Sequence, residues 1–139
     1  MTENKIKKGF KIEILNNESE KQNKEAKEMP YLKIQSNKEI SDQEKVLKKA
    51  SGLVADDLAK PETYVMTAFE KTPMTFSGSV EPAVFMQLKS IGLSQTQIEN
   101  LTKSLCNLAK QEMDVAKDRV YIEFSDVDGS MWGWNDSTF

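Results

Sequence analysis

The order of apolar and polar positions becomes regular at Pro30. The stretch "YLKIQ" (31–35) alternates apolar and polar side chains, which is typical of a strand with one buried face. Apolar residues then recur at helical spacing, at Val46, Leu47, Ala50, Leu53, Val54 and Leu58. "TYVMTAF" (63–69) is nearly continuous in apolar character, which predicts a buried strand. A strand, a helix and a strand in this order predict a parallel pair with a right-handed crossover.

A capping motif and a proline bound the predicted helix. "SDQE" (41–44) has the pattern of a capping box, in which Ser41 caps the helix and Glu44 reaches back to it. Pro61 ends the helix, because proline cannot continue it. We therefore expect the helix to occupy most of the chain between residues 41 and 61.

The second half of the chain repeats this plan. "AVFMQLKSI" (83–91) predicts a strand, "SQTQ" (94–97) a capping box, and "RVYIEF" (119–124) a further strand. The helical stripe between them consists of Ile98, Leu101, Leu105, Leu108 and Met113. Two related βαβ units predict an α+β (α/β-like) fold, a four-stranded mixed sheet with both helices on one face. We expect the other face to be largely apolar and covered by other subunits.

Residues 1–28 have a different composition, with seven lysines, six glutamates and four asparagines. They are expected to form a polar, disordered or weakly helical extension, although Phe10, Ile12 and Ile14 alternate as in a short strand. Residues 29–139 are expected to form the folded domain. The extension is also compatible with a translation start that lies at Met29, in which case residues 1–28 are a gene-start error whose composition resembles translated spacer.

The amino-acid composition excludes several kinds of partner and catalytic site. The net charge of −3 argues against nucleic acid as the main partner, and the single cysteine excludes an intrachain disulfide. The absence of histidine removes Ser-His and Cys-His nucleophiles and the usual zinc sites, so we expect neither a metal nor a cofactor. No stretch suits a membrane span or a signal peptide, and the expected compartment is the cytosol.

Several long motifs in one order resemble a known family. They are "MP" (29–30), "KPETYV" (60–65), "MTFSGSVEP" (74–82), "KSIG" (89–92), "DRVYIEF" (118–124) and "WGWNDSTF" (132–139). From Pro30 to Phe139 the chain resembles the macrophage migration inhibitory factor (MIF) family of the tautomerase superfamily. The resemblance implies a homotrimer with active sites between subunits. It also implies keto–enol tautomerase activity on phenylpyruvate-like or dopachrome-like compounds; some animal relatives are secreted cytokines.

The resemblance assigns roles by position. Pro30 is expected to be the catalytic N-terminal proline, and Lys60 to bind the substrate carboxylate. Tyr121 is expected to come from the neighbouring subunit. The pocket residues implied are Ser90, Ile91, Glu123 and Trp132. Taken without the resemblance, Pro30 is an ordinary strand-edge proline, Lys60 a solvated lysine at a helix end and Tyr121 a core residue.

The chemistry depends on where the mature chain starts. An internal prolyl nitrogen is an amide, whereas an N-terminal one is an amine that takes a proton. A terminal amine has a pKa near 7.7–8, which an apolar pocket and a neighbouring cation lower. Two interpretations stay open: an enzyme whose chain starts at Pro30, and a non-enzymatic binding or cytokine-type protein in which the extension blocks the proline. Two departures from the family are "AVFM" (83–86) in place of a CxxC pair, and Glu123 in place of asparagine.

Overall fold

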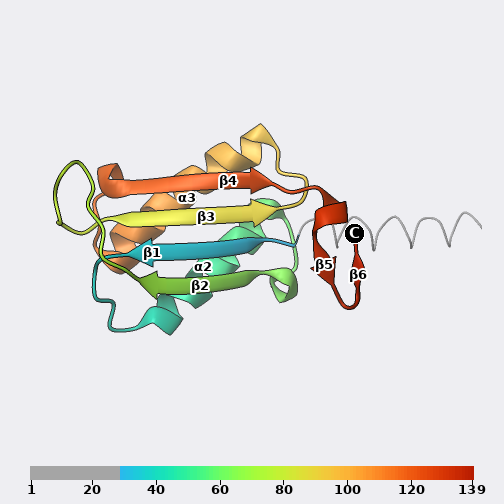
Figure 1. Ribbon diagram of the computed structural model, residues 1–139, viewed down its shortest axis with the longest axis horizontal. Helices are drawn as coiled ribbons and strands as arrows, with labels where there is room; N and C mark the ends of the chain where they lie inside the picture. The colour runs from blue at the N-terminus through green and yellow to red at the C-terminus, as the bar shows by residue number, and fades with distance from the viewer. Residues whose placement is uncertain (1–28) are drawn as a thin grey trace, which may run out of the picture.

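The structure is a computed structural model that describes residues 29–139. The predictions for residues 1–28, including the strand around Ile12, lie outside these described residues. One four-stranded sheet carries two helices on one of its faces (Figure 1). A small two-stranded hairpin follows at the C-terminus, beyond one end of the sheet.

The sheet is mixed, in the order β2-β1-β3-β4. Its strands are β1 (Tyr31–Ser36), β2 (Met66–Lys71), β3 (Val84–Ser90) and β4 (Val120–Asp126). β1 pairs parallel with β2, β3 pairs parallel with β4, and the two units meet through the antiparallel pair of β1 and β3. The predicted repeat, its parallel pairs and the position of both helices are therefore confirmed.

Helix α2 (Gln43–Leu58) begins one residue later than the capping box predicted. The N-cap is Asp42, whose carboxylate accepts the Lys45 N–H at 3.0 Å, so the expectation that Ser41 caps the helix is wrong. Aspartate and serine are comparable N-caps, and Asp42 is the one placed to reach the N3 amide. Helix α3 (Gln95–Met113) begins as predicted, with a complete capping box of Ser94 and Gln97.

The core lies between the sheet and the two helices. Leu32, Ile34, Met86 and Leu88 are fully buried on the strands and meet the stripes of α2 and α3. Each such side chain contributes roughly 1.5–3 kcal/mol by leaving water. Cys106 is half-buried on α3, and burial raises the pKa of its thiol. The raised pKa favours the neutral thiol, and Cys106 packs as a small apolar residue on α3.

Two expectations about burial are wrong in the protomer. The strand predicted over 63–69 begins only at Met66, after a 3-10 turn (Glu62–Tyr64), and Met66 is 63% exposed. β2 lies at the edge of the sheet, where it pairs with β1 alone, so it is not enclosed. The face away from the helices is also mostly polar, because the β4 residues Ile122 and Phe124 pack on the helix side.

This open face is defined by strand alternation and register. Its residues are Tyr31, Lys33, Gln35, Met66, Ala68, Glu70, Phe85, Gln87, Lys89, Tyr121, Glu123 and Ser125. Lys33 and Glu70 form an ion pair at 3.2 Å across β1 and β2. Whether other subunits cover this face stays a prediction.

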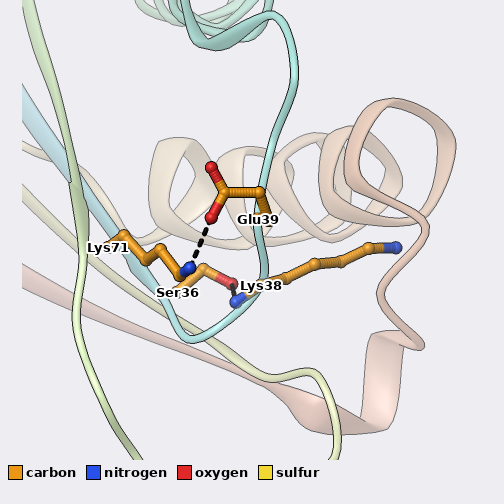
Figure 2. Close-up of polar contacts among 4 residues, drawn as sticks. All are labelled: Ser36, Lys38, Glu39 and Lys71. Atoms are coloured by element: carbon orange, nitrogen blue, oxygen red, sulfur yellow. Dashed lines mark hydrogen bonds and ion pairs between the residues drawn. The ribbon is translucent and has the colours of Figure 1, made fainter.

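The end of the sheet at which β1 stops is tied by polar contacts (Figure 2). The Ser36 hydroxyl donates to the Ala83 carbonyl at 2.8 Å and accepts the Lys38 N–H at 3.1 Å. Lys71, at the end of β2, forms an ion pair with Glu39. These contacts join the chain after β1 to the ends of the strands on either side.

Candidate functional site

A hollow of about 310 Å³ opens at the other end of the sheet, where β1 begins and β3 ends. Its described lining residues are Met29, Pro30, Tyr31, Tyr64, Met66, Lys89, Trp132, Gly133 and Trp134. Pro30 is buried, and its carbonyl accepts the Met66 N–H at 3.0 Å. Proline suits the residue before a strand because it brings no N–H that needs a partner. The candidate base therefore lies in a largely apolar, aromatic hollow.

Aromatic contacts build one wall of this hollow. Tyr64 meets Trp134 edge to face, with ring centroids 6.2 Å apart, and Trp134 stacks on Phe139 at 6.1 Å. Trp134 belongs to the hairpin of β5 (Gly133–Trp134) and β6 (Ser137–Thr138). The connecting residues Asn135 and Asp136 both have positive φ, as a tight hairpin turn requires. The sequence analysis did not predict this hairpin.

The turn before the hairpin is held by Asp128 and by the C-terminus. The Asp128 carboxylate accepts the backbone N–H of Ser130 at 2.9 Å and its hydroxyl at 2.8 Å. These hydrogen bonds lower the pKa of the Asp128 carboxyl. The Phe139 N–H donates to the Gly129 carbonyl at 3.0 Å, and a Cβ at Gly129 would lie 3.1 Å from the Phe139 carbonyl oxygen. Close packing here fixes the chain that carries Trp132 and Trp134.

Ser90 and Ile91 lie at the same end of the sheet and are buried. The Ser90 carbonyl accepts the Val127 N–H at 2.8 Å. The Asp126 carboxylate accepts the N–H groups of Gly92 at 2.8 Å and Leu93 at 3.3 Å, which holds the turn after β3. These contacts fix the chain on both sides of Ile91, but neither Ser90 nor Ile91 is among the described lining residues.

Lys60 is half-buried just after α2. The C-cap Ala59 is in the left-handed region, and the Lys60 N–H donates back to the Ala55 carbonyl at 2.8 Å, which ends the helix and turns the chain. Tyr64, four residues later, lines the hollow. Lys60 thus lies at the hollow's end of the sheet without being one of its described lining residues.

Tyr121 and Glu123 lie away from the hollow. Tyr121 is paired with Phe85, whereas Lys89 is paired with Tyr31 beside Pro30. Phe85 and Lys89 are four residues apart, so Tyr121 is at least about 13 Å from the Pro30 end along the strands. The backbone positions of Pro30 and Tyr121 in one chain are therefore well separated along the sheet.

Tyr121 is 66% exposed, yet its ring has defined neighbours. Phe76, in the loop between β2 and β3, packs against it with ring centroids 4.7 Å apart. The Arg119 guanidinium lies over the Phe76 ring at 5.2 Å and donates to four carbonyls of the same loop, those of Phe76, Ser79, Glu81 and Pro82, at 2.8–3.4 Å. The loop is therefore clasped, and Phe76 is held against Tyr121.

Of the predicted site residues, only Pro30 and Trp132 line the hollow together. The sequence analysis missed Lys89 and the aromatic partners Tyr64 and Trp134. Lys89 projects onto the open face and lies opposite Tyr31 in the antiparallel register. Strand alternation in the sequence indicates that Lys89 lies on the open face. Only the register of β1 and β3 shows that it lies opposite Tyr31, beside Pro30.

Comparisons with known proteins agree on one family. Residues 29–139 match the family model described as macrophage migration inhibitory factor (MIF). The homolog of this factor from Brugia malayi is 40% identical over 114 residues, covering 80% of this chain and 99% of the relative. The crystal structure of the homologue from Prochlorococcus marinus superposes with a TM-score of 0.75 and 38% identity, covering 78% of this chain and 98% of that one. The Toxoplasma gondii structure has a TM-score of 0.75 and 31% identity, covering 78% and 99%.

Proposed function

Because the chain belongs to the macrophage migration inhibitory factor family, we propose that it is a keto–enol tautomerase of the phenylpyruvate tautomerase or L-dopachrome isomerase type. One observation carries the proposal: Pro30 is buried at the start of β1 and lines an apolar hollow walled by aromatic rings. Such a hollow suits a small aromatic keto acid. The general base is the amine of Pro30 in a chain that starts at that residue.

The hollow favours the neutral form of that amine. Apolar and aromatic side chains disfavour an ammonium ion, and nearby lysines repel it, so the pKa falls below the usual value of about 7.7–8. A free amine at neutral pH takes a proton from the carbon next to the keto group. The resulting ammonium then gives its proton to the enolate oxygen, which yields the enol. The reverse order, proton removal from the enol oxygen and return to the carbon, yields the ketone.

The remaining roles need two chains. Lys60 binds the substrate carboxylate, the turn of Ser90 and Ile91 bounds the pocket, and Trp132 lies at its mouth. Tyr121 of a second copy donates a hydrogen bond to the developing enolate oxygen. Glu123 of that copy, where it faces the pocket, repels the carboxylate of an α-keto acid and raises the pKa of the proline amine, so it affects which substrates are accepted. The separation of Pro30 and Tyr121 along the sheet supports a site between subunits of a homotrimer.

A second candidate function rests on Met29. In the full sequence this residue acylates Pro30, and its own side chain lines the hollow. In that form no base is present, and the protein is a non-enzymatic binding or cytokine-type member of the family. The two candidates differ in one property, whether the Pro30 nitrogen is free.

The test compares three purified chains: residues 1–139, residues 30–139, and residues 30–139 preceded by one alanine. Only the chain that starts at Pro30 is expected to interconvert the keto and enol forms of phenylpyruvate. The alanine chain is the matched control, because it blocks the amine and leaves the fold. Equal activity in all three would remove Pro30 as base, and no activity in any would favour the binding protein. Intact mass of the protein from its native source then shows which form exists.

A further inference from the structure

Lys89 gives the hollow a positive charge to which the resemblance assigned no role. Among the described residues that line the hollow, it alone carries a formal charge. It lies near the end of β3, opposite Tyr31 and one residue along from Pro30. The rest of the lining is apolar or aromatic, apart from the backbone.

The charge of Lys89 is not compensated within residues 29–139. Lys33, on the same open face, pairs with Glu70 at 3.2 Å, and Lys49 pairs with Glu112 at 2.6 Å. Lys89 has no carboxylate within 4.0 Å in that part of the chain. Glu123 is paired with Gln87, two residues before Lys89, and Glu70 is already held by Lys33 and Gln35.

We propose that Lys89 is a specificity-determining residue that binds the carboxylate of an aryl keto acid at the mouth of the hollow. The aromatic part of the ligand then packs among Tyr64, Trp132 and Trp134. Lys89 is exposed, so its ammonium can reach an anion held at the mouth of the hollow, and the apolar walls leave less solvent on that side to screen the charge. This proposal rests on the proposed function and adds a second lysine to the expected Lys60.

The experiment uses the chain of residues 30–139 with Lys89→Met, which keeps the apolar stem and removes the charge. Two substrates are compared, phenylpyruvate and its methyl ester. We expect KM for the acid to rise about tenfold in the variant, with kcat little changed, because a charge-assisted hydrogen bond is lost. KM for the ester should not move, and Lys89→Arg should retain most of the affinity for the acid.

Lys33→Met is the matched control, because Lys33 lies on the same face but is paired and does not line the hollow. It should leave both KM values unchanged. The proposal is overturned if Lys89→Met leaves KM for the acid unchanged, or if it raises KM for acid and ester alike.

Binding is measured separately from turnover. Titration with 3-phenylpropanoate, which cannot enolise, is followed by the fluorescence of Trp132 and Trp134. Lys89→Met should weaken this binding about tenfold relative to the parent chain. If the parent chain turns nothing over but binds this anion more tightly than Lys89→Met does, the proposed function fails while the inference about Lys89 stands. If binding is equal in both chains, the inference about Lys89 fails whatever the activity.

Discussion

The two ends of the sheet are held by different forces. At the end where β2 leads into β3, Arg119 and Asn37 bind the carbonyls of the connecting loop through a set of directed hydrogen bonds. At the Pro30 end, the hollow is walled by ring contacts of Tyr64, Trp134 and Phe139 and by a short hairpin. Figure 1 shows this loop and the hairpin at opposite ends of the sheet.

The kind of contact at each end of the sheet matches the residues that it holds in place. Hydrogen bonds fix direction, so the clasped loop holds Phe76 and through it the exposed Tyr121 ring in one orientation. Ring contacts leave an apolar space that a ligand can share. Under the proposed function, the donor Tyr121 and the base Pro30 lie at different ends of the sheet, so a second chain must bring them into contact.

The largest effect on activity should come from two variant chains, one without the Tyr121 hydroxyl and one without a free Pro30 amine. Tyr121→Phe in the chain that starts at Pro30 should lower kcat roughly 10²-fold, because one donor to the developing oxyanion is lost. The chain with an alanine before Pro30 should also be inactive. Refolding equal amounts of the two together should place a free Pro30 beside an intact Tyr121 at about a quarter of the interfaces of a random homotrimer.

The measurement is the activity of the refolded mixture against each chain refolded alone. Recovery of activity far above the average of the two supports a site built from two chains. Activity equal to that average would mean that Pro30 and Tyr121 do not meet between subunits.

Removing the clasp should cost stability. Arg119→Leu leaves several loop carbonyls without their donor, and we expect the free energy of unfolding to fall by about 2–3 kcal/mol. Urea unfolding at matched chain concentration measures this. Lys103→Leu, an exposed site on α3, is the control and should change stability by less than about 0.5 kcal/mol. A similar loss of unfolding free energy in both variants would show that the Arg119 hydrogen bonds stabilise the protein no more than an exposed surface lysine does.

Crowding the hairpin end should have a smaller effect. In Gly129→Ala the new Cβ would meet Phe139 at 3.1–3.3 Å, so the C-terminus must shift, at a cost of about 1 kcal/mol. The near-ultraviolet signal of Trp132 and Trp134 should change with it. Gly52→Ala is the matched control, since its Cβ would have 3.9 Å to its nearest neighbour and lies in α2. It should stabilise the protein slightly, and an unchanged tryptophan signal in Gly129→Ala would contradict this packing.

The smallest effect should be a pH dependence of the same turn. The pKa of Asp128 is lower in the folded state, so its hydrogen bonds to Ser130 stabilise fully above the ordinary carboxyl pKa. That stabilisation is lost as the pH falls through the lowered folded pKa. Tryptophan fluorescence should therefore change over this acidic range, and Asp128→Ala should remove that part of the change. An identical profile in the variant would assign the change to other carboxyls.

The repeat of strand, helix and strand was predictable because its information is local. Alternation places Leu32 and Ile34 on one face, and helical spacing does the same for Leu101 and Leu105. The helix caps were nearly as predictable from the sequence. At the start of α2, however, Ser41 and Asp42 are both suitable N-caps, and only the backbone geometry decides for Asp42. The edge position of β2 was not readable, because exposure depends on strand order rather than on a strand's own residues.

The residues that line the hollow were likewise predictable only where the signal lies in one contiguous stretch of sequence. The motif around "MP" identified Pro30, and "WGWNDSTF" identified Trp132, because both motifs are contiguous stretches. Lys89 was missed because its relation to Pro30 runs across two strands. The expected roles of Lys60, Ser90, Ile91 and Glu123 stay predictions.

By itself the sequence determined the two helices, the four strands of the main sheet in outline, the internal repeat and the family, since periodicity and motifs act over a few residues. It did not determine the C-terminal hairpin. Tertiary structure alone decided that Tyr121 and Pro30 lie about four residues apart along the sheet, and that Lys89 lies beside Pro30. The physical reason is register: a strand's own pattern sets which face a side chain takes, but only its partner strand sets what it stands opposite.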